Sequence, residues 1–317
     1  MTRFRPDAGE RLRIGVFTES WKPYMSGVVR SIESFASELS AQGHELFIFA
    51  PGYPGHRRRE RNVFRFLSLP APTNPDFRLC IPLSPRLGWT AARLGLDLIH
   101  VHSPFLMGQL GVRLARRLRL PLVFTFHTLY HHYAHYVPLP RPLTEWAALR
   151  WSRDFCNGCD LVIAPTPGVR DFLLRLGVTT RVEVLPTGVD PQRFRQGDPT
   201  WLRRSYRLGE GPVLLYVGRL GREKNLGLLL RAYSRVRAVH PDCRLVLVGD
   251  GPEEPALRAQ ARSLGVADGV VFTGRFGDRE LASGEVAVRH RREGDLGRWS
   301  LEAFIQRLRR EVEQRSV

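Results

Sequence analysis

The sequence predicts an α/β fold in which two doubly wound domains face a cleft and the second domain is incomplete. Short apolar runs alternate with segments of helical period, which is typical of parallel strands joined by right-handed helical crossovers. This alternation occurs twice, and it stops after about residue 275. We therefore expect domains at 1–190 and 212–317, joined by a linker at 191–211.

The first block begins with the strand RIGVFTE and a loop that leads into a helix. Val28, Ile32, Phe35 and Leu39 fall on one face of this helix, and Gly43 ends it. Further helices are expected at 105–118, 141–155 and 167–176, and strands at 13–19, 44–51, 96–104, 121–128, 159–166 and 181–189.

The second block restarts the same rhythm. Its strands are expected at 212–219, 243–251 and 270–275, and its helices at 225–240 and 252–266. The segment that follows residue 275 is polar and has no clear strand. It ends in an amphipathic helix, SLEAFIQRLRREVEQ, so the second domain is short of strands for a doubly wound sheet.

Charge and composition narrow the class of protein. Of the 317 residues 43% are apolar, and the net charge is +17. Positive charge spread along the chain suits either a phosphate-bearing substrate or an anionic membrane surface. The attraction to such a surface is about 1 kcal/mol per basic residue near the lipid. No nucleic-acid-binding signature accompanies it. Without an apolar stretch of roughly 18–20 residues or a signal peptide, a cytoplasmic location is expected, with peripheral contact at the inner face of the membrane.

Four cysteines are too few for a disulfide scaffold in a chain of this length. Cys156 and Cys159 have C-x-x-C spacing, but Cys80 and Cys243 are isolated. Small buried residues at a helix end are favoured over a redox or zinc site, which stays open as an alternative.

The segment YVGRLGREKNLGLLL carries Lys224, one of two lysines among 48 basic residues. A compact ammonium retained where arginine is otherwise used suggests a role that a planar guanidinium does not fill. Arg219 and Lys224 bracket a turn between a strand and a helix, which is a common position for an anion. The competing interpretation is a solvated lysine at an exposed strand end.

His127 ends the strand at 121–128, at the sheet edge where ligands of such folds bind. A metal site formed by His127, His131, His132 and His135 is the alternative. It is disfavoured because no carboxylate lies between these histidines and a proline soon follows.

Seven motifs occur in one order: TESWKPYMSGVVRSI, HVHSPF, FTFHTLYHHYAHYVP, VIAPTPGVRDFL, VLPTGVD, VGRLGREKNLGLLL and LVGDGPE. Together they resemble the family 4 glycosyltransferases of the GT-B fold, and the aromatic third motif is similar to the diacylglycerol glucosyltransferase branch. The resemblance implies retaining transfer of a hexose from a nucleotide-diphosphate sugar, with UDP-glucose favoured, to a lipid or other glycosyl acceptor. It implies no metal and no cofactor. Buried tyrosines would give the same aromatic motif.

The resemblance also implies roles for individual residues. Arg219 and Lys224 would stabilise the leaving diphosphate, and His127 would face the transferred sugar. Gly27, Gly249 and Gly251 would permit close approach of the main chain to the donor, although loop glycines are often turn residues only.

The family's paired E-x7-E carboxylates are not clearly present. Glu285 and Glu293 have the spacing in an unsuitable context, so Glu293 and Glu302, with one extra residue between them, are the better donor-binding candidates. Loss of an internal piece of the second domain is the alternative. Two hypotheses follow: an active retaining glycosyltransferase, or a catalytically defective remnant that keeps the acceptor and membrane face.

Overall fold

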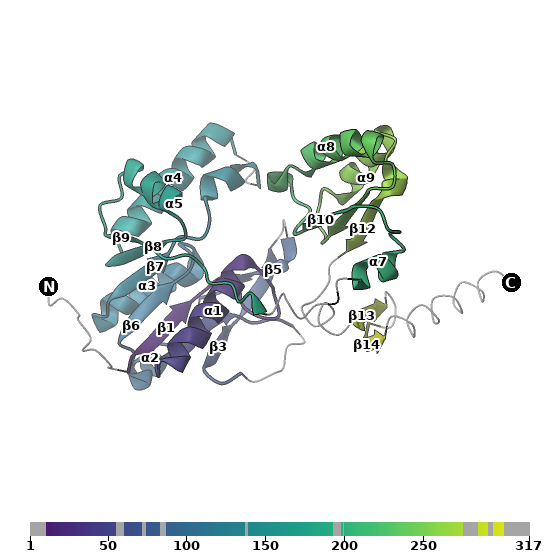
Figure 1. Cartoon of the computed structure of the whole chain (residues 1–317). Coiled ribbons are helices and arrows are strands. Elements are labelled where there is room, and N and C mark those ends of the chain that lie inside the picture. Colours follow the sequence, from purple (N-terminus) through teal and green to yellow (C-terminus); the bar gives the residue numbers. More distant parts are fainter. Residues whose placement is uncertain are drawn as a thin grey trace. The chain divides into compact units, whose positions relative to one another are not determined.

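The chain divides into two compact units, residues 1–189 and 190–317 (Figure 1). The segment at 191–211 lies within the second unit. The structure is a computed structural model, and it describes residues 11–54, 60–71, 74–82, 87–136, 139–192, 198, 200–274, 285–290 and 294–300.

Unit 1 is built on a seven-stranded sheet with the order β3-β2-β1-β6-β7-β8-β9, and every neighbouring pair is parallel. The chain builds the sheet outward from β1 on one side and then returns to continue on the other, which is a doubly wound topology. The strands are β1 (Arg13–Phe17), β2 (Glu45–Pro51), β3 (Val63–Phe66), β6 (Leu98–Val101), β7 (Leu122–Thr125), β8 (Leu161–Ala164) and β9 (Val182–Val184).

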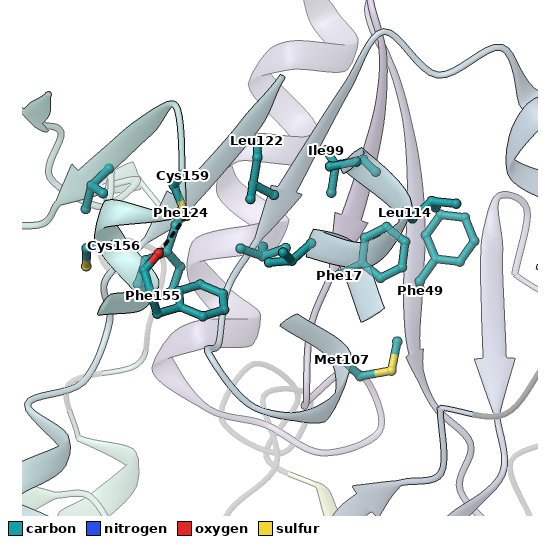
Figure 2. Close-up of a cluster of buried hydrophobic side chains, with 14 of the residues drawn as sticks. Phe17, Phe49, Ile99, Met107, Leu114, Leu122, Phe124, Phe155, Cys156 and Cys159 are labelled. Carbon is teal, nitrogen blue, oxygen red and sulfur yellow. Dashed lines mark hydrogen bonds between the residues drawn. The ribbon is translucent and has the colours of Figure 1, made fainter. Parts of the chain in front are cut away.

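Helices cover both faces of this sheet. Side chains alternate between the two faces along each strand, so apolar residues on both faces are buried against helices. Ile14 and Val16 of β1 pack with the first helix, whereas Phe17 and Phe49 belong to a larger core on the opposite face (Figure 2). The first helix is α1 (Gly27–Ala41); the larger core takes side chains from α2 (Leu87–Leu94), α3 (Leu106–Leu118), α4 (Arg141–Asn157) and α5 (Pro167–Arg175).

The predicted strands and helices of unit 1 are confirmed to within a few residues, but several elements were not predicted. These are β3, α2, the hairpin of β4 (Ser68–Ala71) and β5 (Asn74–Cys80), and the 3₁₀ segment η1 (Tyr130–Tyr136). The hairpin contains Pro70, which is unusual inside a strand, and Leu69 and Leu79, directly opposite each other, are both exposed. A half-exposed short hairpin lacks the apolar run that marks a buried strand.

Unit 2 contains a three-stranded parallel sheet with the order β10-β11-β12. Two helices share a core with one face, and a third helix packs on the other. The strands are β10 (Val213–Val217), β11 (Arg244–Val248) and β12 (Val270–Gly274); the two helices are α8 (Leu226–Val239) and α9 (Glu254–Ser263), and the third is α7 (Trp201–Tyr206).

The prediction of no clear strand after residue 275 is wrong for part of that segment. An antiparallel pair forms between β13 (Glu285–His290) and β14 (Gly294–Ser300). Main-chain pairing satisfies these polar residues without the apolar run on which the sequence argument relied. The helix predicted at 300–314 begins at the last residue of β14, and the rest of it lies outside the described residues.

Candidate functional site

Three neighbouring strands of unit 1 place polar side chains at one edge of the sheet. β1, β6 and β7 are adjacent in the sheet order, and they are followed by Glu19, His102 and His127. Because the strands are parallel, their carboxyl ends share an edge, and this is where doubly wound folds bind ligands. His127 was predicted here, whereas Glu19 and His102 were not.

The two histidines are joined directly. His102 Nδ1 lies 2.8 Å from His127 Nε2, and the two rings stack with centroids 5.1 Å apart. His102 also packs on the ring of His100, whose Nε2 is 2.7 Å from Thr125 Oγ1. His102 is only 2% exposed, and its Nε2 has no hydrogen-bond partner in the part of the chain that the structure describes. His127, by contrast, is only half-buried.

Burial keeps this histidine group neutral. Desolvation lowers the pKa of His127 to about 4, and burial together with the proximity of His127 lowers the pKa of His100 to about 3. The pKa of His102 falls well below its ordinary value, chiefly through burial and also through its two histidine neighbours. At neutral pH each ring therefore carries a single N–H.

Glu19 links the same edge to helix α3. Its carboxylate accepts hydrogen bonds from the main-chain N–H of Met107 (2.6 Å) and from Ser103 Oγ (3.2 Å). Phe105, which precedes the helix, offers no side-chain cap, so Glu19 satisfies an N-terminal donor from a distance. Burial raises the pKa of Glu19 to about 7 against the opposing effect of these two hydrogen bonds.

Gly27 lies at the first position of helix α1, where Ser26 caps the helix by accepting from the N–H of Val29 (3.3 Å). A Cβ built on Gly27 would meet no atom within 4 Å. The residue is exposed, and its predicted contact with the donor stays a prediction.

In unit 2 the basic pair lies on the loop between β10 and α8. Leu220, fully buried, anchors this loop directly after Arg219. Lys224 ends a 3₁₀ turn, η2 (Arg222–Lys224), and is exposed. Among the described residues, no acidic side chain forms an ion pair with Arg219 or Lys224.

Helix α8 begins immediately after this pair. Asn225 makes no side-chain capping bond, and no acidic residue lies in the first turn. The first N–H groups of a helix have no partner within the helix and carry partial positive charge. The loop therefore combines two cations with a helix N-terminus that suits an anion.

Gly249 and Gly251 lie on the neighbouring loop, between β11 and α9. The loops are joined through the main chain, because Leu220 N–H donates to Asp250 O (2.7 Å) and Glu253 N–H donates to Leu220 O (3.0 Å). A Cβ on Gly249, where φ is +134°, would lie 2.0 Å from Gly218 O. These glycines thus allow two loops to touch, a structural reason additional to the predicted contact with the donor.

Models of two protein families match the chain. Residues 25–193 match "Glycosyltransferase Family 4", and residues 200–283 match "Glycosyl transferases group 1". The chain belongs to glycosyltransferase family 4. This agrees with the resemblance carried by its sequence motifs.

Several curated relatives are similar to this family 4 chain. The alpha-monoglucosyldiacylglycerol synthases of Streptococcus pneumoniae and Acholeplasma laidlawii are 33% and 31% identical over 86% and 78% of the chain. The chain spans 63% and 65% of their lengths. A GDP-mannose-dependent alpha-mannosyltransferase of Mycobacterium tuberculosis is 32% identical over 86% of the chain and 70% of the relative.

Solved structures support the fold of this family 4 chain. HepE of Anabaena, in complex with UDP-glucose, gives a TM-score of 0.64 at 18% identity, over 84% of this chain and 70% of that one. Sucrose-phosphate synthase from Thermosynechococcus elongatus gives a TM-score of 0.62 at 20% identity, over 86% of this chain and 72% of that one. Both likenesses concern the GT-B fold.

Among the described helices, none is long and apolar enough to cross a membrane.

The predicted carboxylates of the family 4 donor site are not placed. Glu293 and Glu302 lie outside the described residues, and Glu285 is the first residue of β13. Their assignment to the donor stays a prediction.

The histidines of the alternative metal site have other partners in the structure. His127 is bonded to His102, and the ring of His131 stacks on Phe172 with centroids 5.3 Å apart. No group of three metal-ligating side chains was found among the described residues, and the side chain of His135 is not one of these.

The two C-x-x-C cysteines are packing residues. Cys156 and Cys159 are buried in the core of unit 1, where burial raises the pKa of Cys156 to about 12. The thiol of Cys159 donates to Phe155 O (3.3 Å; Figure 2). A thiolate, the form that reacts or binds metal, is therefore strongly disfavoured.

Proposed function

We propose that this chain is a retaining glycosyltransferase that moves a hexose from a nucleotide-diphosphate sugar, of the UDP-glucose type, to a diacylglycerol-like lipid. The observation that carries the proposal is the loop of Arg219 and Lys224, two cations without an acidic partner among the described residues, next to the uncapped start of α8. The names of the relatives, which specify alpha-glucosyl-diacylglycerol and alpha-mannosyl transfer, support it.

The chemistry follows from the charge that develops. As the bond between the anomeric carbon and the diphosphate breaks, negative charge accumulates on the leaving phosphate. Arg219 and Lys224 would stabilise that charge, and helix N–H groups would add directed donors without reorganisation. We propose that this clamp replaces a metal ion. His127, at the ligand-binding edge of unit 1, would contact the transferred sugar.

The acceptor side is proposed from an exposed stripe on α4. Leu143, Trp146, Arg150 and Trp151 recur at helical spacing and are all exposed, and the Arg150 guanidinium lies 5.5 Å from the centre of the Trp146 ring. Tryptophan and arginine suit the boundary between lipid and water. In the aromatic segment, Tyr130 packs edge-on against Phe105 and Phe126, so its ring is occupied within unit 1.

A transfer assay tests the proposal. The purified chain is incubated with UDP-[¹⁴C]glucose and with GDP-[¹⁴C]mannose, in vesicles that contain diacylglycerol and phosphatidylglycerol. We expect a labelled alpha-linked glucosyl lipid from UDP-glucose, with its anomeric configuration read by NMR. A beta-linked product would contradict retention.

The second candidate is the defective remnant, and the exposed β10 strand favours it. This strand is an edge of the described parallel sheet, and Leu215 and Val217 are 56% and 64% exposed. A chimera in which unit 2 is replaced by the second half of the S. pneumoniae synthase tests this candidate. If the chain transfers no sugar while the chimera does, the remnant is the correct interpretation.

Vesicle sedimentation tests the membrane surface. We expect Trp146→Ser combined with Trp151→Ser to weaken binding to phosphatidylglycerol vesicles by about tenfold, because two interfacial aromatics are lost. Leu69→Ser, which removes an exposed leucine of the β4–β5 hairpin, is the matched control and should bind as the parent does. The reverse result would assign the contact to the hairpin.

A further inference from the structure

We propose that His102 is a positioning residue that holds His127 in its Nδ1–H tautomer, so that this N–H can donate to an oxygen of the transferred sugar. The tautomer follows from the geometry and the burial of unit 1 residues. The contact with sugar rests on the proposed function. Nothing in the sequence motifs distinguishes His102 from His100, the other histidine of the HVH segment.

The first step is the proton count. Desolvation lowers the pKa of both rings well below neutral pH, so each carries one N–H at pH 7. The 2.8 Å contact between His102 Nδ1 and His127 Nε2 is a hydrogen bond, and one of these two nitrogens must be the donor.

The second step is the environment of the remaining nitrogen of His102. If His127 Nε2–H were the donor, the single proton of His102 would lie on Nε2, which is buried and has no acceptor among the described residues. A buried donor without an acceptor is rare and costly. With His102 Nδ1–H as the donor, Nε2 carries only a lone pair, which is the less costly of the two orphaned groups.

The third step concerns His127. When its Nε2 accepts from His102, its own proton must lie on Nδ1. No described protein group is bonded to that nitrogen, and the ring is only half-buried. His127 is therefore prepared to donate to a hydroxyl or ring oxygen of a ligand. Among the described residues, the hydrogen bond to His127 comes from His102, whereas His100 is bonded through its Nε2 to Thr125 Oγ1.

Nitrogen NMR tests the tautomer without any need for activity. In the protein labelled with [¹⁵N]histidine, long-range ¹H–¹⁵N spectra separate protonated from bare ring nitrogens, and His127→Gln identifies the His127 signals. We expect a protonated Nδ1 and a bare Nε2 on His127 at pH 7. A protonated Nε2 would overturn the proposal, whether or not the chain transfers sugar.

Substitutions test the consequence for catalysis. Asparagine at position 102 can place an amide N–H near the position of Nδ1, whereas leucine cannot. We expect His102→Leu to lower kcat by about tenfold with little change in the KM for lipid, and His102→Asn to stay within about threefold of the parent. The control for packing damage is His100→Leu, which removes the partly buried histidine of β6 that packs on the His102 ring.

The results separate the two proposals. Equal rates for His102→Leu and His102→Asn, with folding verified by thermal unfolding, would overturn the positioning role. If the parent transfers no sugar, the proposed function fails, and the NMR spectrum of the parent still decides the tautomer.

Discussion

The two units begin their sheets in the same way and then differ. In unit 1 the order β3-β2-β1 continues through β6, β7, β8 and β9, so that β1 is a central strand, with Val16 1% exposed and Phe17 fully buried. In unit 2 the equivalent order β12-β11-β10 stops at β10 in the described parallel sheet, and Val217 is 64% exposed. The same half of a doubly wound fold is thus completed in one unit and left open in the other.

The exposure of β10 does not follow from its amino-acid composition. The β10 sequence, VLLYV, is the apolar run expected of a strand that is covered on both faces. The loop after β10 is nevertheless held from one side, because Leu220 is buried in the core and is hydrogen-bonded to the loop of Gly249. The loop thus holds its form without the neighbours that β1 has.

Acid should affect unit 1 most, since it carries three histidines, at 100, 102 and 127, whose pKa values are lowered by desolvation. Their lowered pKa values mean that the unfolded chain binds protons first, so stability is lost as the pH falls from about 6.5 towards 4. Glu19, with a pKa raised to about 7, opposes this, because its folded form keeps a proton that the unfolded form releases.

The net effect of three histidines against one carboxyl is a loss of roughly 2 kcal/mol per pH unit in the free energy of unfolding. Urea unfolding between pH 7 and 4.5, followed by fluorescence and hydrogen exchange, checks it. Unit 1, which holds these histidines, should unfold before unit 2. A pH-independent unit 1 would show that the histidines titrate normally.

The chain carries one lysine in each unit, and this offers a matched pair of substitutions. Lys224→Ala should lower kcat by about 10²–10³-fold, and Lys224→Arg by more than about tenfold, because charge stabilisation develops in the transition state. Lys22, ion-paired with Glu33 in unit 1, is the control. Lys22→Arg should leave the rate of transfer unchanged, and equal losses at both positions would remove Lys224 from the site.

Gly249 and Gly27 provide a third comparison, because a Cβ would collide with the main chain at Gly249 and would meet no atom at Gly27. Gly249→Ala should destabilise unit 2 by about 2–3 kcal/mol, because the new Cβ would collide with Gly218 O at a backbone angle that alanine avoids. Gly27→Ala places a methyl group in open space at a helical position, so the Tm should stay unchanged or rise slightly. A lowered kcat/KM in Gly27→Ala without any loss in Tm would support the predicted approach of the donor.

The smallest effect is expected from one substitution made in both sheets. Val16→Thr buries a hydroxyl in unit 1 and should cost about 1–2 kcal/mol of unfolding free energy. Val217→Thr, on the exposed strand, should change it by less than about 0.5 kcal/mol. A large loss at Val217, measured by urea unfolding, would show that β10 is covered in solution.

Sequence reasoning succeeded where a local pattern decides the structure. The apolar strands and the face of α1 that carries Ile32 are in place, because hydrophobic period fixes both. His102 was missed because its importance depends on the ring of His127, 25 residues away and on the next strand end in space. Glu19 was missed for the same reason, since it caps a helix 88 residues distant. The exposure of β10 depends on neighbouring strands, which its own residues do not specify.

Nucleotide binding tests the central claim, that unit 2 holds a diphosphate through Arg219 and Lys224. Thermal unfolding of the chain is followed with UDP, UDP-glucose, GDP and GDP-mannose, and repeated with Lys224→Ala and Lys22→Arg. A ligand at 100 times its Kd should stabilise the folded state by about 2.7 kcal/mol. We expect UDP and UDP-glucose to raise the Tm of the parent and of Lys22→Arg but not of Lys224→Ala; no shift with any nucleotide, or the same shift in all three proteins, would contradict the account.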